Sequence, residues 1–334
     1  MLNPYDGVNW ETAQQIMTTT HDHVYDQAVS TSTKQHFNNL YNGGVRCFAI
    51  SNYYPSAPMY PLSDWTEELD EPVPDDIIEI PNSEHHHFRV NSAYGNSVHL
   101  NPVGSTIVSG KPRGEDPSGY AGAVETFIPE ALSQLLYADG GGITVNHPKW
   151  TQAQNTFPDR LFSYLLDLDD RVLGIEMYSS NTWDLEMWDS ILCSGRRCWG
   201  FAVPDHKHKS HADWTGREML IVPELTQHEC LRAIRNGCFY AKIANTELRF
   251  TKIAVENNAL TVTANASGTI RFIADGITVK ETTGTTASYP LENVGTYIRA
   301  EVETENDRLF TNPVMLTVRR KNARHFRNAA AFAV

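Results

Sequence analysis

Short apolar runs alternate with amphipathic segments from the N-terminus to about residue 240. Seven of these runs have the length and the β-branched or aromatic content of strands, at residues 15–20, 45–50, 76–80, 97–100, 142–146, 171–178 and 197–203. Helix ends can be recognised in the amphipathic segments: one segment between the strands stops at Gly140, and another, after the last strand, begins at Thr226 and stops at Gly237. Strands that alternate with helices are typical of parallel βα units. The pattern fits a closed barrel as well as an open sheet.

The pattern changes at about residue 246, where strands follow one another with only tight turns between them. Turn pairs such as Asn257-Asn258 and Asp275-Gly276 separate the apolar runs, and no segment with a helical period occurs before residue 319. This favours a small all-β sandwich of six or seven strands. We therefore expect an α/β domain over residues 1–243, a β-sandwich domain over 244–320 and a basic, alanine-rich tail over 321–334.

Length and charge narrow the functional classes. The 334 residues suit about two domains of ordinary size. They include 27 Lys and Arg against 40 Asp and Glu, which gives a formal net charge of -13. So acidic a chain repels phosphates at long range, which argues against unaided binding to a nucleic-acid backbone or an anionic membrane, whereas it suits divalent cations. The 13 histidines are the unusual part of the composition.

The compartment is inferred from cysteines and from missing targeting signals. Five cysteines without a CxxC pair are most simply reduced. The first residues lack the basic and apolar regions of a signal peptide, and no run approaches the roughly 20 apolar residues of a membrane span. We expect a cytoplasmic protein that does not contact a membrane, although a signal peptide removed beforehand would leave the same pattern.

Histidines and carboxylates follow the predicted strands one after another. His21 and His23 come directly after the first strand, and residues two apart in an extended segment point the same way. Further residues of metal-ligand type recur at later strand ends: Glu84, His85, His86, His87, His99, His147, Glu176, Asp205, His206 and His208. The carboxyl ends of parallel strands meet at one mouth, where barrel active sites lie, so we predict a metal site there. The run 85–87 is either a surface loop or the source of a single ligand or substrate contact.

In this order, residues 12–240 resemble the PHP (polymerase and histidinol phosphatase) superfamily of metal-dependent phosphoesterases. The resemblance rests on His21-x-His23, Glu84 after the third strand, His99, His147-Pro148 and Asp205. Residues 216–241 are also similar to the segment that follows the barrel in family members with a C-terminal β-domain. The resemblance implies a distorted (β/α)7 barrel, followed here by the small β-sandwich.

The resemblance also implies which residues hold metal ions. One ion would be held by His21, His23, Glu84 and Asp205, and a second by Glu84, His99 and His147. Glu84 would bridge the two ions. Imidazole and carboxylate ligands suit Zn, Mn or Fe. Glu176 would lie at the rim, orient a histidine as a second-layer residue, or be structural.

Two departures from the family pattern both affect a third metal site. Where family members carry an Asp-His pair after the second strand, this chain has Asn52 and Tyr53. The usual late Asp-x-His is Asp205-His206-Lys207-His208 here, so Lys207 takes the expected histidine position. We therefore expect two ions. A third would need His206 or His208 to shift into place, with help from Tyr53 or Asp26.

The implied activity is hydrolysis of a phosphoric ester, by a hydroxide that bridges the metal ions. The substrate would be a phosphorylated small molecule or a phosphodiester. Asp205 or His206 would protonate the leaving oxygen. Lys111, Arg113 and Lys149 are the candidate phosphate-binding cations, the first two in a Gly/Pro-rich loop at 108–122 that is either a lid or a solvated loop.

Two alternatives use the same residues. A binuclear site could also hydrolyse a C–N or carboxylic-ester bond, because an activated hydroxide attacks carbonyls as well. The protein could instead be a non-catalytic, metal-stabilised binding or adhesion protein. The position of the cations relative to the metal ligands separates the first alternative from phosphoester hydrolysis, and turnover separates the second from both.

Overall fold

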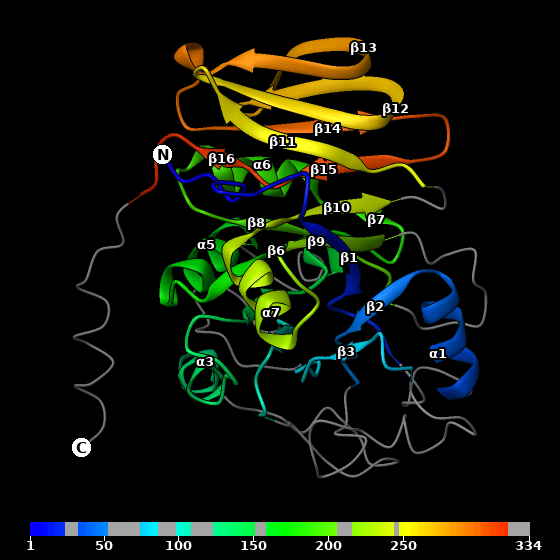
Figure 1. Ribbon diagram of the computed structural model, residues 1–334. Helices are drawn as coiled ribbons and strands as arrows, with labels where there is room; N and C mark the ends of the chain where they lie inside the picture. Colours follow the sequence, from blue (N-terminus) through cyan, green and yellow to red (C-terminus); the bar gives the residue numbers. More distant parts are fainter. Residues whose placement is uncertain are drawn as a thin grey trace.

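The structure, a computed structural model, describes residues 1–23, 33–52, 74–85, 98–107, 123–150, 158–205, 216–243 and 247–319. Over these residues the protein has a mixed α/β fold in which strands outnumber helices. The strands form two hydrogen-bonded sheets, and the C-terminal strands β11 to β14 lie together at one end of the molecule (Figure 1). This agrees with the predicted order of an α/β region before a strand-rich region.

The larger sheet combines strands from both ends of the chain. Its 11 strands have the order β11-β12-β14-β15-β10-β9-β1-β2-β3, with β13 on β12 and β16 on β14. The strands are β1 (Gln14–Thr19), β2 (Val45–Phe48), β3 (Ile78–Glu79), β9 (Gly216–Val222), β10 (Phe239–Ile243), β11 (Phe250–Glu256), β12 (Ala259–Ala274), β13 (Ile277–Pro290), β14 (Tyr297–Glu303), β15 (Arg308–Thr311) and β16 (Val314–Met315). β1 pairs in parallel with β2 and antiparallel with β9. The strand that leads to His21 is therefore held on both sides.

The smaller sheet supplies the other predicted strands. Its five strands are β4 (Leu100–Val103), β5 (Gly142–Val145), β6 (Val172–Ser179), β7 (Thr182–Trp183) and β8 (Trp199–Val203). β6 pairs in parallel with β5 and β8, and all three strands are buried along their whole length, as expected of parallel strands covered on both faces.

The expectation of a parallel strand that ends at His99 is wrong. β4 begins only at Leu100 and runs antiparallel to β5. In an antiparallel pair the start of one strand lies beside the end of the other. The backbone N–H of Asn146, just after β5, accordingly donates to the carbonyl of His99 at 3.1 Å. His99 therefore reaches the predicted mouth from the opposite strand direction.

The described residues form two facing sheets and not one hydrogen-bonded barrel. β3 and β4 are edges of different sheets, and a single isolated bridge between His85 and Leu100 connects their neighbourhoods. β8 lies beside β9, but no ladder joins the two in the part of the chain that the structure describes. Buried side chains of both sheets share one core cluster, which includes Cys47, Val103 and Phe201. In the described part of the chain, the sheets thus enclose a common interior and meet at two seams that no ladder closes.

Helices cover the sheets in the N-terminal part of the chain. They are α1 (Thr33–Asn42), α3 (Val124–Ser133), α5 (Pro158–Leu168), α6 (Leu185–Cys193) and α7 (Gln227–Asn236), with a short 3-10 helix η3 (Leu291–Asn293) further on. The hydroxyl of Thr226 caps α7, and Gly237 ends it at a φ of 70°, where a side chain would collide with Trp199. Within the described residues, no helix has the length and apolar character needed to cross a membrane.

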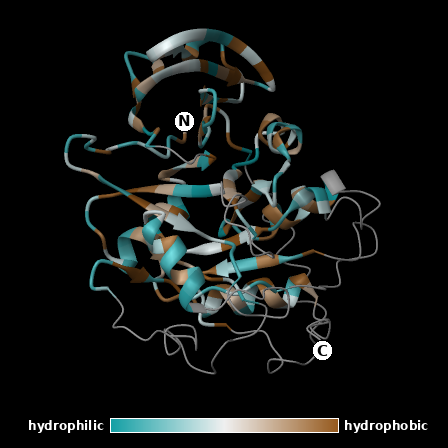
Figure 2. Cartoon of the chain, turned by 90° about the vertical axis from the view of Figure 1, so that its right-hand side faces the viewer, coloured by the Kyte–Doolittle hydropathy of each residue, from teal (hydrophilic) through white to brown (hydrophobic). Residues whose placement is uncertain are grey.

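The C-terminal strands are organised around the long hairpin of β12 and β13. Burial alternates along the first half of β12, and Figure 2 shows matching hydrophobic and hydrophilic bands on the strands at this end of the molecule. β10, before the predicted boundary at residue 243, pairs with β15, which follows it. The boundary stays a prediction, and the tail 321–334 lies outside the described residues.

One buried arginine links the two parts of the chain. The guanidinium of Arg299, on β14, donates two hydrogen bonds of 2.8 Å to Asp189 of α6. It also donates to Glu301 at 2.5 Å and lies over the ring of Trp188, 4.8 Å from its centre. Only 2% of the Arg299 side chain is exposed, so its charge depends on these carboxylates for compensation.

Replacing this arginine should destabilise the whole protein. In Arg299→Met the carboxylates of Asp189 and Glu301 lose their main cation while they remain largely buried, which we expect to cost about 3–5 kcal/mol. Arg271, which is more exposed and pairs with Glu281 and Glu303, serves as the control. Arg271→Met should lower the free energy of unfolding by no more than about 1 kcal/mol. Thermal or urea unfolding measures both variants, and equal losses would contradict the proposed role of Arg299.

Candidate metal centre

The loop after β1 places His21 and His23 in the interior. Ser51, after β2, clamps the residue between them: its hydroxyl accepts from the Asp22 N–H at 3.0 Å, and its own N–H donates to the Asp22 carbonyl at 2.9 Å. The His23 N–H donates to the carboxylate of Asp22 at 3.0 Å. Both imidazoles are fully buried. The first two strands thus fix the histidine pair together.

Glu84 comes from the segment after β3, which is anchored to the same two strands. Its N–H donates to the Ser51 carbonyl at 2.9 Å. The side-chain amide of Asn82 donates to the carbonyls of Thr20 at 2.7 Å and Ala49 at 2.9 Å. These bonds bring a fully buried carboxylate into contact with the histidine pair.

Four side-chain atoms surround one point in the interior. The Nε2 atoms of His21 and His23 are 3.2 Å apart, and each lies 3.2 Å from Oε2 of Glu84. They lie 3.3 and 3.4 Å from Oδ1 of Asp205. We call these four residues the quartet. In a tetrahedral zinc site with ligands at about 2.0–2.1 Å, neighbouring ligand atoms are about 3.3 Å apart.

One carboxylate oxygen of the quartet has no hydrogen-bond partner among the described residues. Oε2 of Glu84 accepts no hydrogen bond from the described residues, although it is buried and faces two ring nitrogens. Two carboxylates and two imidazole nitrogens pointed at one buried position form a donor set of the kind that binds divalent metals. The residues present therefore fit a metal ion.

A second cluster shares Glu84 through its other oxygen. Oε1 lies 2.7 Å from Nδ1 of His99 and 3.0 Å from Nε2 of His147, and the amide of Asn146 donates to it at 3.3 Å. The three ligand-type residues also qualify as a candidate metal group. The distances to the two histidines are ordinary hydrogen-bond lengths and are shorter than those within the quartet. Glu84 thus joins two candidate sites, one through each oxygen.

Glu176, on β6, contacts one histidine of each cluster. Its Oε1 lies 2.7 Å from Nδ1 of His21, and its Oε2 accepts the backbone N–H of His147 at 2.7 Å. An Nδ1 proton shared with Glu176 leaves Nε2 of His21 with its lone pair toward the quartet. Glu176 is therefore placed to orient one histidine by its ring and the other by its backbone.

Two of the ligand-type residues have unusual backbone conformations. The backbone φ angle is 26° at His147 and 42° at Asp205. Residues other than glycine seldom adopt such positive values. The Asp205 N–H donates to the carbonyl of His21 at 3.1 Å, and the Ser180 hydroxyl donates to Oδ2 of Asp205 at 3.0 Å. Such strain persists only where surrounding contacts hold it, and it is frequent at functional sites.

The electrostatics of the site favour a bound cation. Burial lowers the pKa of His21, but the carboxylates of Glu176, Glu84 and Asp205 outweigh burial and raise this pKa to about 10. Burial raises the pKa of Glu84, whereas the charges of His21 and His99 and the hydrogen bond from His147 hold it well below its usual range. In the metal-free protein at neutral pH, a proton on His21 therefore takes the place of the missing positive charge.

The other predicted site residues that the structure describes belong to neither cluster. Lys149 is exposed beside the second cluster, and its backbone N–H donates to Asp184 at 3.0 Å. His85 is buried against the ring of Phe127 at 4.4 Å, and its Nε2 lies 2.8 Å from the Ser83 hydroxyl. The remaining predicted residues lie outside the described residues: Asp26, Tyr53, His86, His87, Lys111, Arg113, His206, Lys207 and His208.

Sequence reasoning missed an asparagine network and a tryptophan at this site. The amide of Asn101 donates to the Thr20 carbonyl at 2.9 Å, and the amide of Asn146 donates to Asn101 at 2.7 Å. Trp150 lies over the rings of His99 at 4.5 Å and His147 at 5.3 Å while 40% of it stays exposed. Their positions in the sequence could have identified these asparagines, because Asn82, Asn101 and Asn146 each lie within two residues of a predicted ligand.

The protein thus has a mixed α/β fold and a buried cluster of His, Glu and Asp side chains of the kind that binds metal ions. No family model matches the chain, and no curated protein matches it. A similar solved structure is a two-domain protein from Bacteroides vulgatus ATCC 8482 that contains a predicted PHP-like metal-dependent phosphoesterase. The two are 12% identical, the match covers 93% of this chain and 96% of that one, and the TM-score is 0.49. We therefore infer function from the geometry of this chain's own side chains.

Metal content should depend on Glu84 more than on any other ligand. Glu84→Gln removes the charge shared by both clusters, so we expect it to abolish most metal binding, whereas His99→Ala should remove only the ion of the second cluster. His228→Ala is the control, because this histidine on α7 pairs with Asp139 and belongs to neither candidate metal cluster. Elemental analysis of the purified proteins measures metal per chain. Equal metal content in Glu84→Gln and His228→Ala would rule out this centre.

Metal binding should release protons. Because the pKa of His21 is about 10 in the metal-free protein, its ring is protonated below that pH and must lose the proton to bind a metal. The apparent affinity should therefore rise with pH by about tenfold per unit for one released proton, up to about pH 10. Calorimetric titrations in buffers of different ionisation enthalpy count the protons. Glu176→Gln should reduce proton release at pH 8, since it removes the carboxylate that most raises this pKa.

Proposed function

We propose that this protein is a metal-dependent hydrolase of phosphoric esters. The observation that carries the proposal is that two clusters share Glu84. Its buried carboxylate presents one oxygen to His21 and His23 and the other to His99 and His147. Two adjacent cation sites of this kind are typical of enzymes that displace phosphate esters. A bound divalent ion there would supply Lewis-acid chemistry and activate water.

The protein's own residues would prepare the site for this chemistry. Glu176 holds the ring proton of His21 on Nδ1, so that Nε2 faces inward. Ser180 holds one oxygen of Asp205 while the other faces the histidine pair. We assign the quartet to one ion and Glu84, His99 and His147 to the second. A third ion would need His206 or His208 to shift into place, with help from Tyr53 or Asp26.

Substrate would approach from the side of Trp150 and Lys149. Trp150 covers the rings of His99 and His147 and forms an exposed wall beside them. Lys149, next to it in the chain, supplies a positive charge for the non-bridging oxygens of a phosphate. Lys111 and Arg113 are further candidates for this role, and His206 is the candidate acid for the leaving oxygen. The substrate class we propose is a phosphomonoester or phosphodiester of a small molecule.

The direct test is turnover by the full chain. With Mn²⁺ or Zn²⁺ we expect hydrolysis of p-nitrophenyl phosphate or bis-p-nitrophenyl phosphate, loss of activity with a chelator, and a decrease of at least about 100-fold in Glu84→Gln. His228→Ala should keep full activity. Turnover of p-nitrophenyl acetate alone would favour the carboxylic-ester alternative, and phosphatase activity that survives in Glu84→Gln would refute the proposed centre.

Lys149 should contribute to phosphate binding. We expect Lys149→Ala to raise KM for the phosphoester about tenfold, with a smaller change in kcat, because the charge acts on the bound phosphate in both the ground state and the transition state. Lys252→Ala is the control, since this lysine pairs with Glu256 on β11. Steady-state kinetics at constant ionic strength measure both. An unchanged KM in Lys149→Ala would remove this residue from the substrate site.

A further inference from the structure

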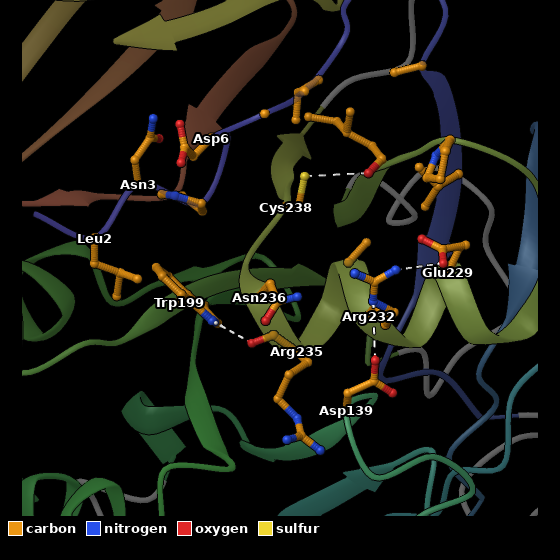
Figure 3. Close-up of a pocket in the computed structure, with 18 of the residues that line it drawn as sticks. Leu2, Asn3, Asp6, Asp139, Trp199, Glu229, Arg232, Arg235, Asn236 and Cys238 are labelled. Atoms are coloured by element: carbon orange, nitrogen blue, oxygen red, sulfur yellow. Dashed lines mark hydrogen bonds and ion pairs between the residues drawn. The ribbon is translucent and has the colours of Figure 1, made fainter.

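A cavity lies at the opposite ends of the strands that carry the metal centre. Its volume is about 930 Å³, and its walls come from the N-terminal segment before β1, from the residues just before β5 and β6, from the start of β8 and from α7 (Figure 3). The quartet residues His21 and Asp205 follow β1 and β8, whereas the cavity lies where these strands begin. β8 alone spans about 16 Å, so the two sites are separate.

Four arginines line this cavity, and two of them are neutralised by carboxylates. Arg171 pairs with Asp169 through two bonds of 2.9 Å, and Arg232 donates to Glu229 at 2.8 Å. Figure 3 shows the bonds of Arg232 to Glu229 and Asp139. The acidic residues on the wall thus serve mainly these two arginines, although Asp6 and Asp170 also line the cavity.

Arg197 and Arg235 are bonded differently. Arg197 donates from one nitrogen, Nη2, to the carbonyls of Asp170 at 2.5 Å and Val172 at 3.0 Å. Arg235 donates to the carbonyls of Gly140 at 2.9 Å and Gly141. Across the described residues, no carboxylate forms an ion pair with either guanidinium. Nε and Nη1 of Arg197 and Nη1 of Arg235 are therefore available to a ligand.

The positive charges are close enough to repel one another. Burial lowers the pKa of Arg235, and the charge of Arg171 lowers it further, whereas Asp169 and Asp139 act in the opposite direction. Burial is also the main cause that lowers the pKa of Arg197, and Arg235 adds to it while Asp170 opposes it. Half-buried guanidiniums that destabilise one another's charged form would be stabilised by an anion between them.

Trp199 contacts both arginines. Its indole N–H donates to the backbone carbonyl of Arg235 at 3.1 Å, and the guanidinium of Arg197 lies 5.2 Å from its ring centre. In Figure 3 the side chain of Arg235 extends from α7 away from the Arg232–Asp139 pair. Apolar wall residues such as Leu2 and Ile221 complete the cavity. The cavity is thus a half-open one that combines cations with apolar surface, a combination found in small-molecule sites.

We propose that this cavity binds a phosphorylated small molecule, with its phosphate at Arg197 and Arg235 and the rest of the molecule along the N-terminal segment. Planar guanidiniums match the oxygens of a phosphate in pairs, and a dianion suits several converging arginines better than a single carboxylate does. The volume exceeds that of a free phosphate and lies in the range of small-ligand pockets. The proposal does not depend on the activity of the metal centre.

The test is binding of defined anions to the full chain in the presence of a chelator, which keeps the metal centre out of the measurement. The probes are AMP, inorganic phosphate and citrate, followed by calorimetry. We expect AMP to bind more tightly than inorganic phosphate, and Arg235→Gln and Arg197→Gln each to weaken it about 10- to 100-fold. Arg196→Gln is the matched control, because the neighbouring Arg196 pairs with Asp167 and does not line the cavity.

Two further measurements keep the test decisive. Arg235→Lys keeps the charge but loses the planar fork, so it should bind AMP with intermediate affinity even if Arg197→Gln folds poorly. Modification of Arg235 by phenylglyoxal, located by mass spectrometry, should be slowed by AMP. Binding of citrate alone would overturn the assignment to phosphate. No binding of AMP at millimolar concentration, or equal binding by Arg235→Gln and Arg196→Gln, would overturn the site.

Discussion

A single buried carboxylate, that of Glu84, organises the interior of this protein. A charge without access to water is costly unless positive or hydrogen-bonding groups surround it. Glu84 meets that requirement by directing each oxygen at a different pair of histidines, supplied by β1, the start of β4 and the end of β5. The ends of β1 and β5 and the start of β4, which come from both sheets, must therefore meet at the same place for the charge to be tolerated, and the asparagine network holds these segments together.

The C-terminal strands contribute to this arrangement although they carry none of the ligands. β10 pairs with β9, which pairs with β1, so the strand before His21 and His23 is continuous with β15 through hydrogen bonds. The hydroxyl of Tyr5 donates to the carbonyl of Phe239 at 2.8 Å and accepts the N–H of Asn312 at 2.7 Å. Arg299 adds a charged link to α6. The two predicted regions are thus joined by backbone, polar and ionic contacts.

Much of the fold and of the candidate site could be predicted from local sequence, because a short apolar run between turn signals is a property of the run itself. Each of the seven predicted strands overlaps an observed one, and the four residues that the family resemblance assigns to one ion lie together as the quartet. The direction of β4 was not predictable, since it depends on the path of the chain before it. Glu176 had several possible roles because its contacts join residues far apart in the sequence. Arg197 and Arg235 gave no signal, since only the folded chain brings the end of α7 beside Trp199 and the residues before β5.

The position of β10 has a consequence for how the chain can be divided. This strand uses one edge to pair with β9 and the other to pair with β15, so neither edge is open. A chain cut after Ile243 would leave a row of unsatisfied N–H and C=O groups on a strand whose residues are mostly buried. Such an edge is a template for pairing between molecules. The C-terminal strands therefore cover an edge through which the N-terminal region would otherwise associate with other copies of itself.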